Sequence, residues 1–268
     1  TKGSTCYFSN AKQLPYIAAF LNSVVANELL KILAPTLDYN AGSIAKVPVI
    51  WDKEQYDRIA EIFQDTVKES KEDWDSFETS WDFKVHPLVY LSKGLWDATA
   101  TAATMDYYYG YLPEASCPLE ICYLLWQGQC KERFEKLKDN EEELNRIFID
   151  IYGLQDELTP EVEDKDVTVR KADLGRDVRS FISYAVGCMF GRYSPTYDGL
   201  AYAGGTWDDG KYNIYKPDAD GIIPICDDEY FEDDMVGRFV EFVRVVYGDS
   251  SLEDNLRFIA NALGGKGQ

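Results

Sequence analysis

Apolar residues recur every three or four positions along several stretches of the chain, which is the spacing of helices that bury one face. The first stretch covers residues 14–33 and stops before Pro35, because a residue that precedes proline is pushed out of the helical region. The same spacing predicts later helices at about 53–69, 94–111, 118–138, 141–153, 173–191, 232–247 and 252–262. The pattern therefore predicts a mainly α fold.

Two of these helix starts carry a capping signal. Asn140 with Glu143 three residues later resembles a capping box and divides one long helical stretch in two. Ser251 with Asp254 makes the same pattern before the last helix. We therefore expect a helix boundary at each of these positions.

Little of the chain has the pattern of a strand. Residues 5–8 and 44–50 are read as short strands, and Pro48 places the second at a sheet edge or a strand end. We expect these two strands to lie in one small sheet with the 14–33 helix packed on it. A further strand is predicted at 221–225, and residues 155–169 are an acidic linker or irregular crossing. The predicted fold is a small α/β recognition-module tail followed by a multi-helix domain with little strand.

The net charge of −20 is unevenly distributed along the chain. Residues 1–50 hold four lysines and two acids, a balance of +2, so residues 51–268 carry −22. A surface this acidic repels phosphate, which makes the second region a poor candidate for an extensive nucleic-acid surface. The change of sign predicts a domain boundary near residue 50, between residues 1–50 and 51–268, with a possible sub-boundary near 155–170.

Composition also narrows the setting in which the chain is expected to work. The longest near-continuous apolar run, residues 181–190, is half of the roughly 20 residues that a membrane span needs, so no membrane partner is expected. The six cysteines form no CxxC pair and no signal peptide is visible, which favours reduced thiols in the cytoplasm. The chain starts at Thr1 and ends in a glycine-rich stretch, so we expect a piece of a longer protein.

Motifs for catalysis are weak. His86 is the single histidine and stands beside Pro87, which favours a structural role. Glu163-Asp164-Lys165, with Asp156 upstream, has the shape of a metal-dependent nuclease motif, but such a match is frequent by chance among 47 acids. Residues 216–227 resemble a calcium loop but begin with Lys216 and end with Asp227, so we expect a turn of solvated acids. No catalytic, cofactor-binding or metal-binding residue is predicted.

Basic residues give the candidate DNA contacts. A cluster at Arg170, Lys171, Arg176 and Arg179 opens the 173–191 helix, where Arg176 and Arg179 share a face and could touch phosphates. Salt bridges to the surrounding acids are the alternative interpretation. Residues 1–50 carry a positive balance, so repulsion of phosphate does not argue against DNA contact there. The predicted DNA-contacting residues are therefore Lys12, Asn40, Lys46, Arg170, Lys171, Arg176 and Arg179.

Several stretches resemble known DNA-modifying proteins. Leu21-Asn22-Ser23, followed by Gly42, Ile44 and Pro48, is similar to the closing segment of target-recognition domains in bacterial DNA methyltransferases and restriction specificity subunits. The remaining chain resembles the PglX family of BREX phage-resistance adenine methyltransferases. That resemblance lies in residues 73–88, 140–162, 177–194, 199–205 and 252–264, in the family's order.

The resemblance implies a parent enzyme that transfers a methyl group from S-adenosylmethionine to adenine N6 in a non-palindromic DNA site, within a phage-defence complex. The family's catalytic Asn/Asp-Pro-Pro-Tyr/Phe motif, which grips a flipped adenine, is absent from this sequence. Leu14-Pro15-Tyr16 is the nearest tripeptide. The chain is thus expected to be a non-catalytic region downstream of the catalytic domain, without a cofactor of its own.

Four functions stay open at this point. The chain could contribute to DNA target recognition or complex scaffolding in such an enzyme, meeting DNA through the parent protein. It could be an acidic module that docks partner subunits without touching DNA, or a DNA clamp built from residues 1–50 and the Arg170–Arg179 cluster. A metal-dependent nuclease at Glu163 and Lys165 is the fourth alternative.

Overall fold

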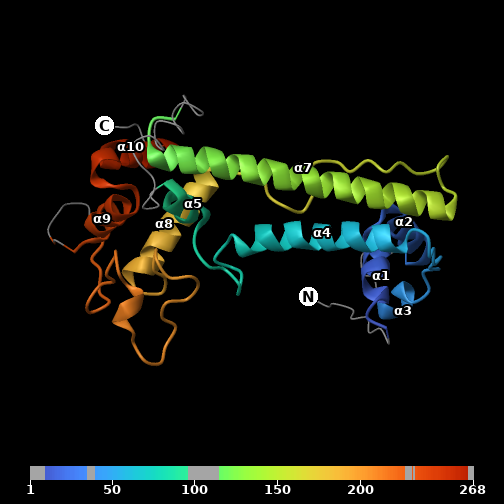
Figure 1. The fold of residues 1–268 in the computed structure, drawn as a ribbon, viewed down its shortest axis with the longest axis horizontal. Helices are drawn as coiled ribbons and strands as arrows, with labels where there is room; N and C mark the ends of the chain where they lie inside the picture. Colours follow the sequence, from blue (N-terminus) through green and yellow to red (C-terminus); the bar gives the residue numbers. More distant parts are fainter. Residues whose placement is uncertain (1–9, 35–39, 96–114, 227–230, 232, 265–268) are drawn as a thin grey trace. The chain divides into compact units, whose positions relative to one another are not determined.

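The computed structural model describes residues 10–34, 40–95, 115–226, 231 and 233–264, and within them the chain is mainly helical (Figure 1). The α-helices are α1 Gln13–Asn22, α2 Val24–Leu33, α3 Ala41–Ile44, α4 Tyr56–Asp75, α5 Pro87–Leu95, α7 Pro118–Tyr152, α8 Leu174–Met189, α9 Met235–Tyr247 and α10 Leu252–Ala262. Short 3-10 turns stand at η1 Asp209–Lys211 and η2 Asp249–Ser251. Across the described ranges, β pairing is limited to one isolated bridge, so the mainly α prediction is confirmed.

The strand predicted at residues 44–50 is wrong, and no α/β tail is seen in the described residues. Residues 41–44 form α3 instead, because the Asn40 side chain accepts a hydrogen bond from the Ser43 amide at 3.0 Å and caps the turn. Beyond α3, backbone groups that a neighbouring strand would have bonded are bonded by tyrosine hydroxyl groups instead. The Tyr152 hydroxyl donates to the Pro48 carbonyl at 2.6 Å and accepts from the Ile50 amide at 3.0 Å.

Two further strand predictions have different outcomes. Residues 5–8 lie outside the described residues, so the structure does not describe one of the two strands predicted to pair. Residues 221–225 are described and form no strand. The irregular course predicted for 155–169 is confirmed, since neither helix nor strand is found there.

The helix predicted at 14–33 is two helices that meet at a 70° bend. Ser23 causes the break, because its backbone is extended and its hydroxyl accepts a hydrogen bond from the Ala26 amide at 3.3 Å. The same hydroxyl donates to the Phe20 carbonyl at 2.7 Å. A single serine thus ends α1 and starts α2 without any proline.

The boundary predicted at Asn140 is also wrong, because α7 continues from Pro118 to Tyr152. The Asn140 side chain donates to the Asp65 carboxylate at 3.2 Å, and Glu143 pairs with Arg58 and Arg146. With both side chains bound elsewhere, no capping box forms. The 94–111 helix falls mostly outside the described residues.

The predicted start of the last helix is correct in position but not in its cause. Helix α10 begins at Leu252, directly after Ser251. The Ser251 side chain makes no cap bond and donates instead to the Tyr247 carbonyl at 2.9 Å. The capping box expected at this serine is therefore wrong.

The chain packs into two compact units. Unit 1 comprises Thr1–Glu72 and Glu132–Arg170, and unit 2 comprises Asp73–Lys131 and Lys171–Gln268. Helix α7 contributes residues 118–131 to unit 2 and residues 132–152 to unit 1. A domain boundary near residue 50 and a sub-boundary near 155–170 stay predictions.

The core of unit 1 lies where α1, α2 and α4 meet the end of α7. Tyr16, Phe20 and Phe148 are fully buried there, and the Phe20 ring lies 5.4 Å from that of Phe148. The irregular segment after α7 has its own anchor on that helix, a cluster of Phe134, Leu137, Val167 and Val169. Unit 1 is therefore a helical body with one long irregular segment held against it.

The core of unit 2 is rich in aromatic rings. Phe181 and Tyr184 of α8 face Phe242 of α9, with ring centroids 5.6 Å and 6.3 Å away. All three side chains are fully buried. Aromatic rings in tilted and edge-on contact thus join α8 to α9.

Among the described helices, none is both long enough and apolar enough to cross a membrane alone. Helices α1 and α2 meet the length and composition criteria only when taken together.

Candidate functional site

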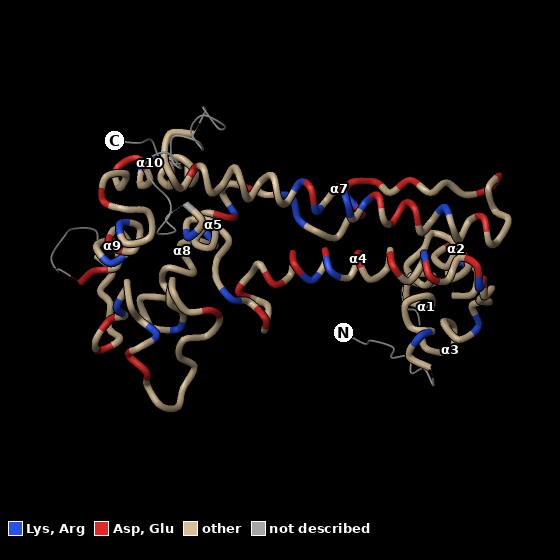
Figure 2. Tube along the Cα trace, viewed as in Figure 1, with Lys and Arg blue, Asp and Glu red and all other residues tan. Residues whose placement is uncertain are grey.

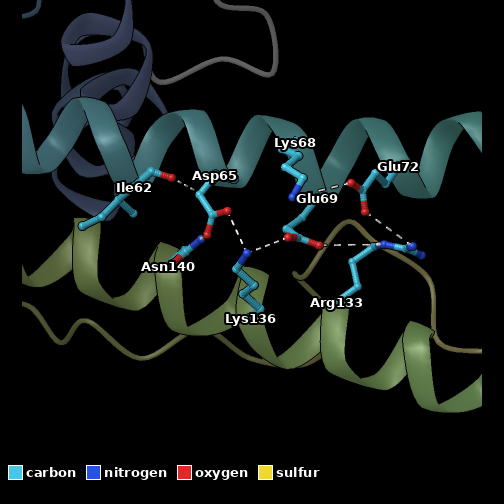
Figure 3. A network of polar contacts seen from close by, with 9 residues as sticks. Ile62, Asp65, Lys68, Glu69, Glu72, Arg133, Lys136 and Asn140 are labelled. Carbon is cyan, nitrogen blue, oxygen red and sulfur yellow. Dashed lines mark hydrogen bonds and ion pairs between the residues drawn. The ribbon is translucent and has the colours of Figure 1, made fainter.

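A network of charged side chains joins α4 to α7 inside unit 1 (Figure 3). Lys136 of α7 donates to Asp65 and to Glu69 of α4, both at 2.7 Å. Asn140 adds a bond to the other Asp65 oxygen at 3.2 Å. Two acids one turn apart on α4 thus meet two donors one turn apart on α7, which fixes the register of the two helices.

The network extends along α4 toward Glu72. Arg133 lies 3.9 Å from Glu69 and 3.9 Å from Glu72, and Lys68 lies 3.8 Å from Glu72. The Glu69 side chain is buried, so its charge depends on these partners. The bonds from Lys136 lower the pKa of Asp65, and those carboxylates raise the pKa of Lys136. These basic groups of α7 are committed to α4.

A groove of about 880 Å³ lies in unit 1, between α1, α2, α4, α7 and the irregular segment after α7. We call the apolar part of its lining the floor and the acidic part the rim; uncharged polar side chains such as Asn27, Thr66 and Ser70 supply the rest of the lining. The apolar lining comes from Ala18, Ala19, Val24, Phe63, Val67, Leu144 and Val162. The charged lining comes from Glu28, Lys31, Glu141, Glu161, Glu163 and Asp166. Figure 2 shows how acidic residues recur along the segment that returns beside α7.

The groove walls are tied together by one buried amide. Asn145 of α7 accepts a hydrogen bond from the Val24 amide at 2.9 Å and donates to the Pro160 carbonyl at 3.2 Å. It therefore links the start of α2 and the return segment to the same point of α7. Glu142 holds the Val162 amide at 3.1 Å, and Lys138 pairs with Asp164 at 2.9 Å.

The carboxyl groups of the groove titrate differently. Burial, with a smaller effect of the nearby Asp166 charge, raises the pKa of Glu141 to about 7. A hydrogen bond from the Thr159 side chain lowers the pKa of Glu161, and one from Lys165 lowers that of Glu163. The rim is consequently anionic at neutral pH while Glu141 holds its proton part of the time.

The predicted DNA-contacting residues of the first fifty have separate surroundings. Asn40 is used as the cap of α3, which occupies the side-chain oxygen that could have met DNA. Lys12 and Lys46 are exposed, and the Lys12 carbonyl accepts a bond from the Tyr56 hydroxyl at 2.5 Å. Their DNA role stays a prediction.

The predicted basic cluster is divided between the units, with Arg170 in unit 1 and Lys171, Arg176 and Arg179 in unit 2. Arg176 is partly exposed, and its guanidinium group is bound within unit 2. Its guanidinium bonds the buried Asp177 carboxylate at 2.8 Å and the Lys171 carbonyl at 2.9 Å, and lies 5.7 Å from the Phe77 ring centroid. The salt bridge of the alternative interpretation is thus present at Arg176, and Arg179 is exposed; the DNA role of the cluster stays a prediction.

The weak catalytic motifs have structural explanations. His86 is buried, its Nδ1 accepts from the Leu88 amide at 3.3 Å, and burial lowers its pKa to about 3. Glu163 and Lys165 are both largely exposed and pair with each other at 2.6 Å. In the part of the chain that the structure describes, no group of three histidine, cysteine or acidic side chains is arranged for a metal ion.

The calcium-like loop folds as a turn of acids. The Asp218 carboxylate accepts from the Asp220 amide at 3.1 Å and the Gly221 amide at 2.8 Å, which is the bonding of an Asx turn. Asp227, the last position of the motif, lies outside the described residues.

Sequence reasoning missed two residues that organise unit 1. Lys136 and Asn145 each act through partners that are distant in sequence, such as Asp65 for Lys136 and Val24 for Asn145. One signal was present. Acids at 65, 69 and 72 and donors at 133, 136 and 140 each follow helical spacing, which indicates two faces of opposite charge.

Comparison with known proteins confirms the resemblance seen in the sequence. The chain is 42% identical over 269 aligned residues to the adenine-specific methyltransferase PglX of Lacticaseibacillus casei (strain Zhang). It is 30% identical over 285 aligned residues to the adenine-specific methyltransferase BrxX of Escherichia coli O9:H4 (strain HS). The alignments cover 100% and 97% of this chain but 21% of each relative. No protein-family model matches the chain.

Proposed function

Because this chain is related over its whole length to a segment of the adenine-specific methyltransferases PglX and BrxX, we propose that it is a non-catalytic scaffold of such an enzyme. The chain spans about a fifth of the length of these curated relatives. In this proposal it lies downstream of the catalytic domain. Methyl transfer from S-adenosylmethionine to DNA adenine is then the work of the rest of the enzyme.

The observation that carries the proposal is the α4–α7 network. Lys136 and Arg133 could have met phosphates, but they are bound to Asp65, Glu69 and Glu72 of the neighbouring helix. Such cross-links hold a helix pair in register, which suits a part that positions others. Together with the net charge of −20, they favour scaffolding over direct DNA contact.

The role includes a proposed setting. The scaffold meets DNA only through the rest of the parent enzyme and docks other subunits of a phage-defence complex of the BREX type in the cytoplasm. Helix α7 suits this role, because its 35 residues contribute to both compact units.

Two binding measurements on this chain test the proposal. We expect titration calorimetry with S-adenosylmethionine to show no stoichiometric heat, because the chain lacks the Asn/Asp-Pro-Pro-Tyr/Phe motif and a glycine-rich cofactor loop. We also expect no shift of duplex DNA at low salt. One molecule of cofactor bound per chain would contradict the assignment of a non-catalytic segment.

A DNA clamp is the second candidate, and the exposure of Lys12, Lys46 and Arg179 favours it. A clamp predicts DNA binding that weakens steeply with salt and is lost in Arg179→Glu and Lys46→Glu. Lys84→Glu is the matched control, since Lys84 is exposed and belongs to neither predicted DNA-contacting group. Salt-dependent binding lost only in the first two variants would replace the scaffold by the clamp.

A further inference from the structure

The groove of unit 1 leaves apolar side chains uncovered at its floor. Val67 of α4 lines the groove and keeps 47% of its surface exposed, one helical turn from Phe63. Val24 of α2, which is partly exposed, and Leu144 of α7, which is buried, line the groove from two other helices. Exposed apolar surface of this kind, inside a concavity and rimmed by polar groups, is typical of a binding site for another molecule.

The rim of the same groove carries an excess of negative charge. Five carboxyl groups line it against one lysine, and that lysine, Lys31, is already paired with Glu28 at 2.5 Å. Glu161, Glu163 and Asp166 are exposed along the return segment. Glu163 is paired with Lys165 at 2.6 Å, but the lining still carries more carboxylates than cations, so a ligand that covers the apolar floor faces a net anionic edge, which favours a cationic ligand.

The walls of the groove are held in place before any ligand arrives. Asn145 ties α2 and the Pro160 carbonyl to α7, and the Glu142 and Lys138 contacts fix the return segment at Val162 and Asp164. A preformed groove loses less conformational entropy on binding than a loop that must be ordered first.

We infer that this groove docks a lysine- or arginine-bearing amphipathic segment of a partner protein. The inference rests on the proposed scaffold function and names the place and chemistry of docking. Apolar side chains of the segment cover Val67 and Phe63, and its basic side chains meet Glu161, Glu163 and Asp166. Duplex DNA does not fit, because its phosphates would face the carboxylates. A small cation would leave the apolar floor uncovered.

A model peptide tests the docking directly. The probe is a fluorescein-labelled 14-residue peptide of leucine and lysine at helical spacing, titrated with the whole 268-residue chain and followed by anisotropy. We expect saturable binding that weakens with salt, and no binding of the same peptide with glutamate in place of lysine. Absence of saturable binding of the lysine peptide overturns the inference.

The rim is tested by matched charge removals. The triple variant Glu161→Gln, Glu163→Gln, Asp166→Asn removes three exposed charges of the groove, and we expect affinity to fall about tenfold. The control triple Glu54→Gln, Glu61→Gln, Glu157→Gln changes the net charge equally at exposed positions outside the groove lining. An equal loss in both triples would show attraction to the acidic surface in general and overturn the inference.

The floor has a separate test with its own control. Val67→Ser removes apolar surface inside the groove, whereas Val49→Ser does so at a residue of unit 1 that is 42% exposed and does not line it. We expect a several-fold loss of affinity for the first and none for the second. If the wild type, Val67→Ser and Val49→Ser bound the peptide with similar affinity, the docking of apolar side chains on this floor would be overturned. Binding of DNA or of S-adenosylmethionine, in contrast, would overturn the proposed scaffold function. The peptide measurements would still decide separately whether the groove docks a basic segment.

Discussion

Unit 1 joins α4 to α7 through charged side chains, whereas unit 2 joins α8 to α9 through aromatic rings. In unit 1, Lys136 bridges two carboxylates at 2.7 Å each. In unit 2, Phe181 lies between α9 and the histidine His86, with ring centroids 5.6 Å from Phe242 and 5.7 Å from His86. Both contacts join two α-helices, but the first is made by charged side chains and the second by aromatic rings.

The difference teaches what each contact can control. Burial of rings is favourable in many relative positions, so it stabilises a body without fixing one register strongly. Charge-assisted hydrogen bonds are directional and lose their partners when a helix shifts by one residue. Unit 2 is therefore expected to depend on packing volume, and unit 1 on a few matched pairs.

The largest expected effect is at the aromatic core of unit 2. Phe181→Ala removes a fully buried ring that contacts Phe239, Phe242 and Tyr247. We expect the free energy of unfolding of unit 2 to fall by about 3–5 kcal/mol, since lost transfer energy and a cavity add together. Urea unfolding followed by hydrogen exchange, resolved by segment, measures this for α8 and α9 separately from unit 1.

The control for that prediction is an aromatic residue with no packing. Trp81 is 99% exposed, so Trp81→Ala is expected to change the same free energy by less than about 0.5 kcal/mol. A cost below about 1 kcal/mol for Phe181→Ala would contradict the aromatic-core description of unit 2.

A smaller effect is expected at the charged contact of unit 1. Lys136→Met leaves the buried Glu69 and its neighbour Asp65 without their shared ammonium group. Because the Lys136 side chain is itself partly exposed, we expect a loss of about 2 kcal/mol rather than the full cost of a buried pair. The measurement is urea unfolding, with hydrogen exchange read in α4.

Lys138→Met is the matched control. Lys138 lies two residues after Lys136 on α7 and pairs with the exposed Asp164 of the segment that follows the helix. We expect little or no change in the free energy of unfolding there, because solvent screens this ion pair. In Lys136→Met, adding Glu69→Gln should restore part of the loss by removing the unpaired charge. Equal costs for the two lysines would contradict the distinction between the inner network and the outer surface.

The same contrast explains what the sequence could predict about the fold. Helical periodicity located α8 and α10 well, because one face of each helix is buried and the apolar spacing records it. Predictions from short sequence motifs failed where the side chain in the motif bonds a residue that is distant in sequence. Asn140 looked like a helix start but bonds Asp65, and the 44–50 backbone is satisfied by the Tyr152 hydroxyl.

The candidate site was less predictable than the fold for the same reason. The groove exists because Asn145 of α7 gathers Val24 and Pro160, and no local pattern pairs residues so far apart. Six of the seven predicted DNA contacts are basic residues, chosen for their charge. At Arg176 that criterion missed Asp177, which directly follows it in sequence and binds it in the structure.

The smallest expected effect uses pH to separate the units. Glutamate in an unfolded chain titrates near pH 4.3, while burial holds the pKa of Glu141 at about 7. Folded unit 1 therefore keeps a proton that the unfolded chain releases, and its stability falls as pH rises through that window. Since the group is partly exposed, we expect Glu141→Gln to stabilise unit 1 by only about 1 kcal/mol at pH 8 and not at pH 4.

Unit 2 should respond to pH in the opposite direction, which makes this measurement a test of the comparison itself. Burial lowers the pKa of His86 to about 3, so the unfolded chain takes up a proton that folded unit 2 refuses, and stability falls as pH drops below about 6.5. Hydrogen exchange at pH 5 and pH 8 should thus show opposite trends in α4 and α8. Glu132→Gln, at an exposed position of α7, should leave both trends unchanged. Parallel trends in wild-type α4 and α8 would mean that Glu141 and His86 do not govern the pH response of their units.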